Sequence, residues 1–484
     1  MTYTSTRGDT TPLTSAQTIV KGLSADGGLY VPSAIPVAEK LPGGACDYSE
    51  HALWLMSQFF TDYTEEELSG CINAAYSAEN FDTPAIAPLV QTPDVAFLEL
   101  FHGRTLAFKD MALSLLPHLM TTALKKTGNP RTQVILTATS GDTGVSALEG
   151  FKDVAGTKII IFYPQDGVSV IQKQHMITQT GKNVCVVGVK GNFDDAQSEV
   201  KRIFMDEGLN ARLNADGYEF SSANSINTGR LVPQIVYYFY AYSQMVKGGL
   251  AKGEAVNFIV PTGNFGNILA GYYAKKMGLP VDTLVCASNE NRVLSDYFDT
   301  GVFDSDRPFY VTTSPSMDIL VPSNFERLVY DVADKAALAN LSKKQKFTMP
   351  APADFVGYYA TEKEMRAAIK KVFVTHGYLI DPHTAVAYVA HEKHSENSRR
   401  INGLRPIILS TASPYKFPKT VMTSIDEKYE KYDDFELLEQ MAELTKRNIP
   451  TQFANLKKQE VLHNTTVEVG GMKDEIFNAL HRFL

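Results

Sequence analysis

Short runs rich in β-branched residues alternate along this chain with longer segments of helical periodicity, and no other feature limits its possible folds as much. The expected strands span residues 133–137, 158–163, 184–189, 258–261, 284–287 and 406–410. The expected helices span residues 111–120, 196–204, 231–245, 268–277 and 364–375. Apolar strands that are separated by helices are typical of parallel sheets covered on both faces. The sequence therefore predicts an α/β protein that binds ligands at the carboxyl ends of its strands.

The length of the chain allows more than one hydrophobic core. With 484 residues, 44% of them hydrophobic, the chain has room for about three units of ~150 residues each. We expect two α/β lobes flanked by smaller parts. The expected division is an N-terminal helical unit in residues 1–95, a first lobe in 96–245, a second lobe in 246–420 and a C-terminal helical appendage in 421–484.

Charge and composition favour a small-molecule partner in a reducing compartment. The net charge is −8, and no block of like charge suggests binding to nucleic acid or to a membrane. The four cysteines form no Cys-x-x-Cys pair, and no secretory signal or apolar stretch of ~20 residues is found. We therefore expect a cytoplasmic protein, either a monomer or a small homo-oligomer. His391 and His394 lack the His-Glu-x-x-His pattern, so we expect no metal.

One lysine occupies an unusual position for a charged residue. Lys109 lies within Thr-Leu-Ala-Phe-Lys-Asp-Met-Ala-Leu, a mostly apolar run from Thr105 to Leu113. Burial there would disfavour the ammonium, lower its pKa and leave an amine that can attack a carbonyl. The alternative is a lysine whose stem packs on apolar groups while its ammonium reaches water. Lys109 is thus a candidate Schiff-base residue. His102, just upstream, could line the same site or pack against its neighbours, and we expect packing.

Two loops between a strand and a helix have the composition of anion sites. Ala-Thr-Ser-Gly-Asp-Thr-Gly follows the strand at 133–137, and Ser140 and Thr143 offer hydroxyls beside a helix N-terminus. Thr-Gly-Asn-Phe-Gly-Asn follows the strand at 258–261, and its amides could converge on a monophosphate. Ordinary capped turns are the alternative. Neither loop contains Gly-x-Gly-x-x-Gly, which argues against a nicotinamide oxidoreductase.

A third polar cluster and a strand end complete the candidate site. The cluster at 222–230 precedes the helix at 231–245, and Ser225, Asn227 and Arg230 could hold a second phosphate. A capped loop with a solvated arginine is the alternative. The strand at 406–410 ends in the polar tip Thr-Ala-Ser-Pro-Tyr-Lys-Phe, which begins at Thr411.

Together, these motifs resemble the threonine synthases, which belong to the pyridoxal-phosphate enzymes of fold type II. The resemblance rests on Leu-Ala-Phe-Lys-Asp, Ser-Gly-Asp-Thr-Gly, Gly-Asn-Phe-Gly-Asn and the threonine at a strand end. It extends to the N-terminal segments at 5–8 and 22–32, which look like those of the longer class of these enzymes. It implies two α/β lobes of the tryptophan synthase β-like kind and pyridoxal 5'-phosphate as cofactor.

The resemblance also implies a role for each candidate residue. Lys109 would carry the cofactor as a Schiff base, Asp142 would lie near its ring hydroxyl and Thr411 would meet its pyridine nitrogen. The cofactor phosphate would bind at Gly263, Asn264, Phe265, Gly266 and Asn267. The substrate carboxylate would bind at Ser140 and Thr143, and its phosphate at Ser225, Asn227 and Arg230.

The implied reaction converts O-phospho-L-homoserine and water to L-threonine and phosphate, by γ-elimination followed by addition of water at Cβ. The resemblance thus implies a carbon–oxygen lyase of threonine biosynthesis. Arg104 and Ser413 depart from the family, which often has proline and histidine there. Two alternatives stay open: a phospho-lyase that releases a 2-oxo acid, and a catalytically silent binding protein on the same scaffold.

Overall fold

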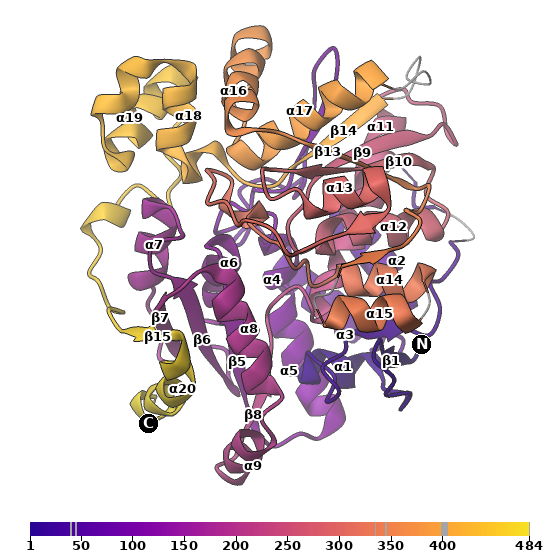
Figure 1. The fold of residues 1–484 in the computed structure, drawn as a ribbon, viewed down its shortest axis with the longest axis vertical. Coiled ribbons are helices and arrows are strands. Elements are labelled where there is room, and N and C mark those ends of the chain that lie inside the picture. Colours follow the sequence, from indigo (N-terminus) through magenta and orange to yellow (C-terminus); the bar gives the residue numbers. More distant parts are fainter. Residues whose placement is uncertain (39–40, 44–45, 334, 344–345, 398–404, 484) are drawn as a thin grey trace.

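Two β-sheets organise the molecule, as the alternation of strands and helices predicts (Figure 1). Residues 1–38, 41–43, 46–333, 335–343, 346–397 and 405–483 are described by the structure, a computed structural model. The five-stranded sheet is parallel throughout, in the order β15 (Thr466–Glu468), β7 (Val184–Lys190), β6 (Thr157–Pro164), β5 (Thr132–Ala138), β8 (Tyr218–Ser221). The six-stranded sheet has the order β13 (Phe355–Tyr359), β10 (Val281–Ser288), β9 (Val256–Pro261), β14 (Arg405–Ser410), β4 (Ala96–Glu99), β3 (Leu89–Gln91). Only β3 runs antiparallel to its neighbour in the six-stranded sheet.

Helices cover the sheets and bury their apolar faces. Before β9 the chain contains α1 (Ser15–Lys21), α2 (Tyr48–Phe59), α3 (Glu65–Ala75), α4 (Asp110–Leu113), α5 (Leu116–Thr127), α6 (Asp142–Phe151), α7 (Val170–Ile177), α8 (Phe193–Phe204), α9 (Glu207–Ala215), α10 (Thr228–Leu231) and α11 (Pro233–Lys247). After β9 it contains α12 (Gly266–Lys276), α13 (Val293–Thr300), α14 (Phe325–Val332), α15 (Lys335–Ser342), α16 (Glu362–His376), α17 (Pro382–Asn397), α18 (Pro418–Ile425), α19 (Asp434–Thr445) and α20 (Met472–Arg482).

The three largest apolar cores of the described residues follow from the alternation of side chains along the strands. Ile135 and Phe258 belong to one large core that both sheets share, together with α2, α5, α11 and α12. Ile259 points to the opposite face of the six-stranded sheet and packs with α16 and α17. Leu136 does the same in the five-stranded sheet, where α8 and α20 supply the partners, including Ile476. The central strands β5 and β9 are therefore buried on both faces, as their continuous apolar sequences require.

The predicted α/β fold is confirmed, and the structure corrects one helix. The expected helix at 111–120 is divided into α4 and α5, and Pro117, at the start of α5, has no N–H to continue a helix through this point. Two short antiparallel pairs lie outside the main sheets: β1 (Tyr3–Ser5) with β2 (Tyr30–Pro32), and β11 (Val302–Phe303) with β12 (Phe347–Thr348).

The division of the chain into four parts stays a prediction, but strand pairing adds detail near two boundaries. β4, at the start of the expected first lobe, pairs in the six-stranded sheet with β14, and β3 follows it there. β15, in the expected helical appendage, pairs with β7 of the five-stranded sheet. Figure 1 shows the yellow C-terminal segment passing from α18 and α19 down to β15 and α20. Both sheets are thus completed by distant segments.

Candidate active site

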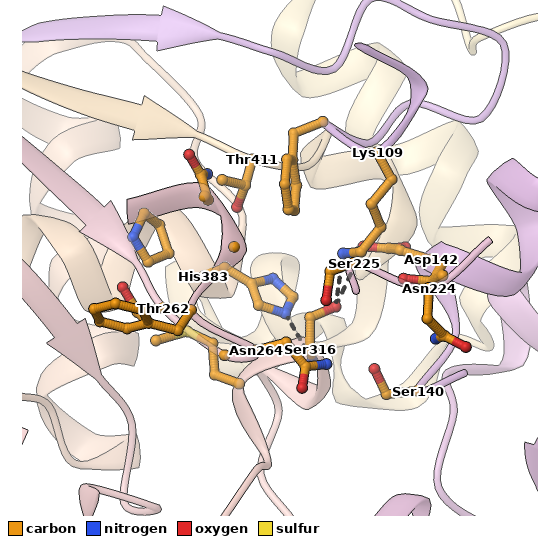
Figure 2. A pocket seen from close by; sticks show the side chains of 18 of the residues that line it. Lys109, Ser140, Asp142, Asn224, Ser225, Thr262, Asn264, Ser316, His383 and Thr411 are labelled. Atoms are coloured by element: carbon orange, nitrogen blue, oxygen red, sulfur yellow. Dashed lines mark hydrogen bonds and ion pairs between the residues drawn. The ribbon is translucent and has the colours of Figure 1, made fainter. Parts of the chain in front are cut away.

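A cavity at the carboxyl ends of strands from both sheets collects most of the side chains that the sequence singles out (Figure 2). Its volume is about 740 Å³, including its opening to solvent, and the carboxyl ends of β5, β9 and β14 border it. The predicted residues that line it are Lys109, Ser140, Asp142, Thr143, Ser225, Arg230, Gly263, Asn264, Phe265, Gly266, Asn267 and Thr411. The strand ends thus bring together residues that are far apart in the chain, as expected for an α/β protein.

Lys109 lies on the loop that connects β4 to α4, and this loop is fixed against the end of β14. The Phe108 amide donates to the Thr411 carbonyl at 2.8 Å. Lys109 is only 7% exposed, and its Nζ lies 4.5 Å from the centre of the Phe108 ring and 3.5 Å from Asp142 Oδ2. Burial lowers the pKa of Lys109 to about 8, while Asp142 acts in the opposite direction. At pH 7 roughly one amine in ten is therefore unprotonated and nucleophilic.

Asp142 is the first residue of α6, and its carboxylate lies beside the Lys109 amine (Figure 2). Its Oδ1 accepts a hydrogen bond from Gln172 Nε2 at 2.7 Å and lies 3.0 Å from Lys416 Nζ. Burial raises the pKa of this carboxyl, but Lys416 and Lys109 together hold it well below its usual range. Asp142 is consequently an ionised carboxylate inside the protein, which an isolated buried aspartate would not be.

The loop before α12 forms a cradle of backbone amides. Phe265 adopts a left-handed conformation (φ 65°), which turns the chain into the helix. A Cβ atom at Gly263 would lie 2.2 Å from the Ser316 carbonyl oxygen, so only glycine fits there. Within the described residues, no protein acceptor is found for the amides of residues 263–267. These free N–H groups at a helix N-terminus suit an anion.

Asn267 adds a side-chain donor to this cradle. Its Oδ1 accepts hydrogen bonds from the hydroxyls of Tyr237 (2.6 Å) and Tyr238 (3.0 Å). Its Nδ2 is buried, lies on a residue that lines the cavity, and has no acceptor among the described residues. Because an unsatisfied buried amide is costly, this donor indicates a ligand oxygen that completes the site.

Hydrogen bonds within the loop before α6 fix its conformation. Thr139 Oγ1 accepts hydrogen bonds from the amides of Gly141 (2.9 Å) and Gly144 (2.7 Å). This arrangement fixes the turn and leaves Ser140 and Thr143 on the cavity wall, at the N-terminus of α6. The two hydroxyls are placed where a carboxylate would also gain from the helix dipole.

The third polar cluster is divided between the cavity and the protein interior. Arg230 lines the cavity and is 2% exposed; its Nη1 donates to the Ala223 carbonyl, and its Nε has no partner among the described residues. Ser225 also lines the cavity and accepts from Asn324 Nδ2 at 3.0 Å, close to Gly266 of the α12 cradle.

Asn227 is the predicted site residue that does not line the cavity. Its Nδ2 donates to the carbonyls of Ile19 and Ser222, and its Oδ1 caps α10 by accepting from the Gly229 amide. All of its polar atoms are thus used within the protein, and it is fully buried. The geometry gives Asn227 a role in holding the cluster and not in contacting a ligand.

Three residues that sequence reasoning passed over are part of the site or support it. His383 lines the cavity; its Nδ1 lies 2.6 Å from Asp381 Oδ2, and its Nε2 accepts the Ser316 amide N–H at 3.2 Å. Ser316 Oγ lies 3.4 Å from Lys109 Nζ. Lys416 contacts Asp142 from outside the cavity. Lys416 is five residues beyond Thr411 in a polar tip that the sequence did mark, whereas nothing in the sequence distinguishes Ser316.

The two departures from the family lie outside the lining of the cavity. Arg104 pairs with Glu149 at 3.3 Å, and Ser413 caps the short 3-10 helix η2 (Pro414–Lys416). Among the described residues, no group of three or more His, Cys, Asp or Glu could hold a metal ion. Within the same part of the chain, no helix is both long and apolar enough to cross a membrane.

Comparison with known proteins defines the class of this chain. The family model described as "Pyridoxal-phosphate dependent enzyme" matches residues 81–408. Two further models, described as "Threonine synthase N terminus" and "Threonine synthase, C-terminal", match residues 2–76 and 384–466. The chain thus has the fold of the pyridoxal-phosphate dependent enzymes.

Comparison with individual proteins identifies the family within this class. The threonine synthase of Schizosaccharomyces pombe is 36% identical over 507 residues, covering 95% of this chain and 94% of its own. The solved structure of a pyridoxal-phosphate-bound threonine synthase from Brucella melitensis has a TM-score of 0.84 and 34% identity, with 100% and 99% of the two chains covered. The human protein threonine synthase-like 1 is 38% identical, and the match spans 58% of its length. This chain therefore belongs to the threonine synthase family, which confirms the resemblance seen in the sequence.

Proposed function

We propose that this chain is a pyridoxal-phosphate dependent threonine synthase, which converts O-phospho-L-homoserine and water to L-threonine and phosphate. One observation carries the proposal: the buried amine of Lys109 shares a single cavity with the amide cradle of α12 and with Arg230. An amine with its pKa lowered to about 8 by burial can capture an aldehyde, and the other two groups can each hold a phosphate oxygen.

The residues present fit the cofactor. The free amides of residues 263–267 and the unpaired Asn267 Nδ2 would hold its phosphate, and Lys109 would bind its aldehyde carbon. Asp142 and Thr411 would face its ring. When bound, pyridoxal phosphate supplies an electron-withdrawing ring that stabilises negative charge on the carbons of an attached amino acid.

The chain's own residues would supply positioning and proton transfer. Ser140 and Thr143 would hold the substrate carboxylate at the N-terminus of α6, and Arg230 would hold the substrate phosphate. Lys109, buried and partly unprotonated, would move protons at Cα and Cβ as phosphate leaves Cγ and water adds at Cβ. The burial of Lys109, Asp142 and Arg230 limits access of unwanted water to these steps.

The test is to incubate the purified protein with O-phospho-L-homoserine and to follow phosphate, threonine and 2-oxobutanoate together. We expect phosphate and threonine in equal amounts, and a loss of at least about a thousandfold in Lys109→Ala, because that variant lacks the group that moves the protons. Phosphate with 2-oxobutanoate would instead identify a phospho-lyase. A protein that binds the cofactor but releases no phosphate would act on another substrate or be a binding protein, and the proposal would be wrong.

We also propose that the protein works in the cytoplasm, as a monomer or a small homo-oligomer, on a small-molecule substrate and without nucleic acid. Cys71, Cys185 and Cys286 are buried free thiols, which supports a reducing compartment. Size-exclusion chromatography coupled to light scattering would measure the oligomeric state directly.

A further inference from the structure

A second lysine, Lys416, lies directly behind the candidate active site. It is 1% exposed, at the end of η2, and does not line the cavity. Its Nζ donates to the Thr105 carbonyl at 2.6 Å and lies 3.0 Å from Asp142 Oδ1. A buried ammonium without an anion would be costly, so the contact with Asp142 is what makes this position tenable.

Asp142 is therefore shared by two ammonium groups, and the sharing is unequal. Lys416 lies 3.0 Å from Oδ1, whereas Lys109 lies 3.5 Å from Oδ2, with Ser316 Oγ 3.4 Å from that same oxygen. One negative charge thus faces two positive ones. Because Lys416 holds the closer contact, the carboxylate is already compensated before Lys109 is considered.

We propose that Lys416 is a positioning residue for Lys109: as the standing counter-ion of Asp142, it leaves the Lys109 amine free to react instead of closing an ion pair with that carboxylate. The inference rests on the proposed role of Lys109 as the reactive amine. It assigns no chemistry to Lys416 itself, which acts through Asp142 and cannot reach the cavity.

Other titratable groups surround Lys109 and Asp142. Besides Asp142 and Lys416, the titratable groups that face this pair are Arg230 on α10, His383 on α17, His175 on α7 and Asp110 on α4. After burial, the positive charges of Arg230 and Lys416 lower the pKa of Lys109, and only Asp142 raises it. Asp110 is engaged by the Thr105 amide and hydroxyl, and burial raises its pKa. Without Lys416, the Asp142 carboxylate would interact more strongly with the Lys109 ammonium.

The experiment measures the Lys109 amine in the full-length chain after the cofactor has been removed. Trace acetic anhydride, a small neutral reagent, labels amines in proportion to their unprotonated fraction, and mass spectrometry of the Lys109 peptide gives the labelling midpoint between pH 6 and 11. Three variants are compared with the unchanged chain: Lys416→Gln removes the charge but keeps a donor for Thr105, Lys416→Arg keeps the charge, and Lys275→Gln is the control. Lys275 is matched because it also binds one carboxylate and one carbonyl, Asp354 and Asp282, each at 2.7 Å.

We expect the labelling midpoint of Lys109 to rise by about one pH unit in Lys416→Gln and to stay near 8 in the other two variants, because only the first removes a positive charge near the amine. A midpoint near 8 in a folded Lys416→Gln protein would overturn the proposal. A rise of about one pH unit in Lys416→Arg, which keeps the positive charge, would also overturn it. The arginine variant still provides this test if the glutamine variant does not fold. Phosphate release by the unchanged holoenzyme is assayed separately. The labelling experiment contains no substrate, so an error in the proposed substrate would not change its result.

Discussion

At the scale of single residues, the site depends on buried polar groups whose hydrogen bonds the described residues do not complete. Arg230 is buried on α10; its Nη1 donates to the Ala223 carbonyl, whereas its Nε has no partner among the described residues. Burial lowers the pKa of Arg230 to about 10, so it stays charged at neutral pH. A buried guanidinium whose Nε has no hydrogen-bond acceptor among the described residues is expected where an anion binds, because the anion supplies the missing acceptor.

Substitution of Arg230 tests this reading. We expect Arg230→Gln to lower kcat/KM for O-phospho-L-homoserine about 10- to 100-fold, since a hydrogen bond to a charged group contributes about 1.5–3 kcal/mol. Steady-state phosphate release measures the effect. Arg307→Gln is the control, because Arg307 pairs with Asp296 at 2.7 Å and does not line the cavity. Equal kcat/KM for the Arg230 variant and the unchanged chain would contradict the role.

Single residues also show where sequence reasoning reached its limit. Asn227 and Ser225 have the same apparent suitability for a phosphate, but Asn227 is used entirely as a cap, and only the folded chain shows this. His383 reaches the site from the start of α17 and not through a strand-to-helix loop, and Lys416, in the polar segment after β14, contacts Asp142 from outside the cavity. Lys109, by contrast, was recognisable because a lysine in an apolar run is unusual in any fold.

At the scale of elements, the site is built where short segments meet backbone to backbone. The loop before α12 packs against the 3-10 helix η1 (Pro315–Met317), and Gly263 is the point of contact. η1 in turn places Ser316 beside Lys109 and is held by His383. The sequence predicted the glycine loop from its position after a strand, but η1 has no periodicity that would reveal it.

Gly263→Ala is predicted to disturb both segments at once. The new Cβ would lie 2.2 Å from the Ser316 carbonyl oxygen and 3.1 Å from Ile319 Cδ1, so η1 or the loop before α12 must shift. We expect a loss of about 1–3 kcal/mol in the free energy of unfolding and weaker binding of pyridoxal phosphate. Urea unfolding and spectrophotometric titration with the cofactor measure the two effects.

The control for this variant is a glycine with free space around it. Gly70 lies within α3, and nothing lies within 4 Å of a Cβ placed there. Gly70→Ala should stabilise the protein by up to about 1 kcal/mol, because alanine favours the helix, and cofactor binding should not change. A Gly263 variant as stable and as tightly binding as the Gly70 variant would show that the close contact is unimportant.

At the scale of the whole molecule, the sequence predicted the layers but not the partners of every strand. Periodicity identified the central strands because they are apolar throughout. It could not show that β4 joins β14 or that β15 joins β7, since such pairings depend on contacts between distant segments. The same holds for α20, whose Ile476 completes the core of the five-stranded sheet.

One ion network ties three distant segments together and makes stability depend on pH. His102, beyond β4, lies 2.6 Å from Asp82 Oδ1 and 2.8 Å from Glu99 Oε2, and the Tyr378 hydroxyl donates to Glu99 Oε1 at 2.8 Å. Burial lowers the pKa of His102, but hydrogen bonds to Asp82 and Glu99 raise it from 6.5 to about 9. His102 packs, as expected, but it does so as a cation.

A raised pKa in the folded state fixes the sign of the pH dependence. The stabilisation by His102 is fully present below about pH 6.5 and is lost as the pH rises to about 9, because the folded chain then loses the proton that the unfolded chain has already released. Since Asp82 is 58% exposed, we expect His102 to contribute about 1–3 kcal/mol and not more. The difference in unfolding free energy between the unchanged chain and His102→Gln should therefore shrink by that amount between pH 6 and pH 10.

His118→Gln supplies the contrast for this measurement. Burial lowers the pKa of His118, so this side chain is neutral in both folded and unfolded chains above about pH 7. The stability difference between the unchanged chain and His118→Gln should stay constant from pH 8 to pH 10, where that of His102→Gln still falls. Parallel pH dependences for the two variants would mean that the network around His102 does not hold the 81–86 loop, β4 and the end of α16 together through charge.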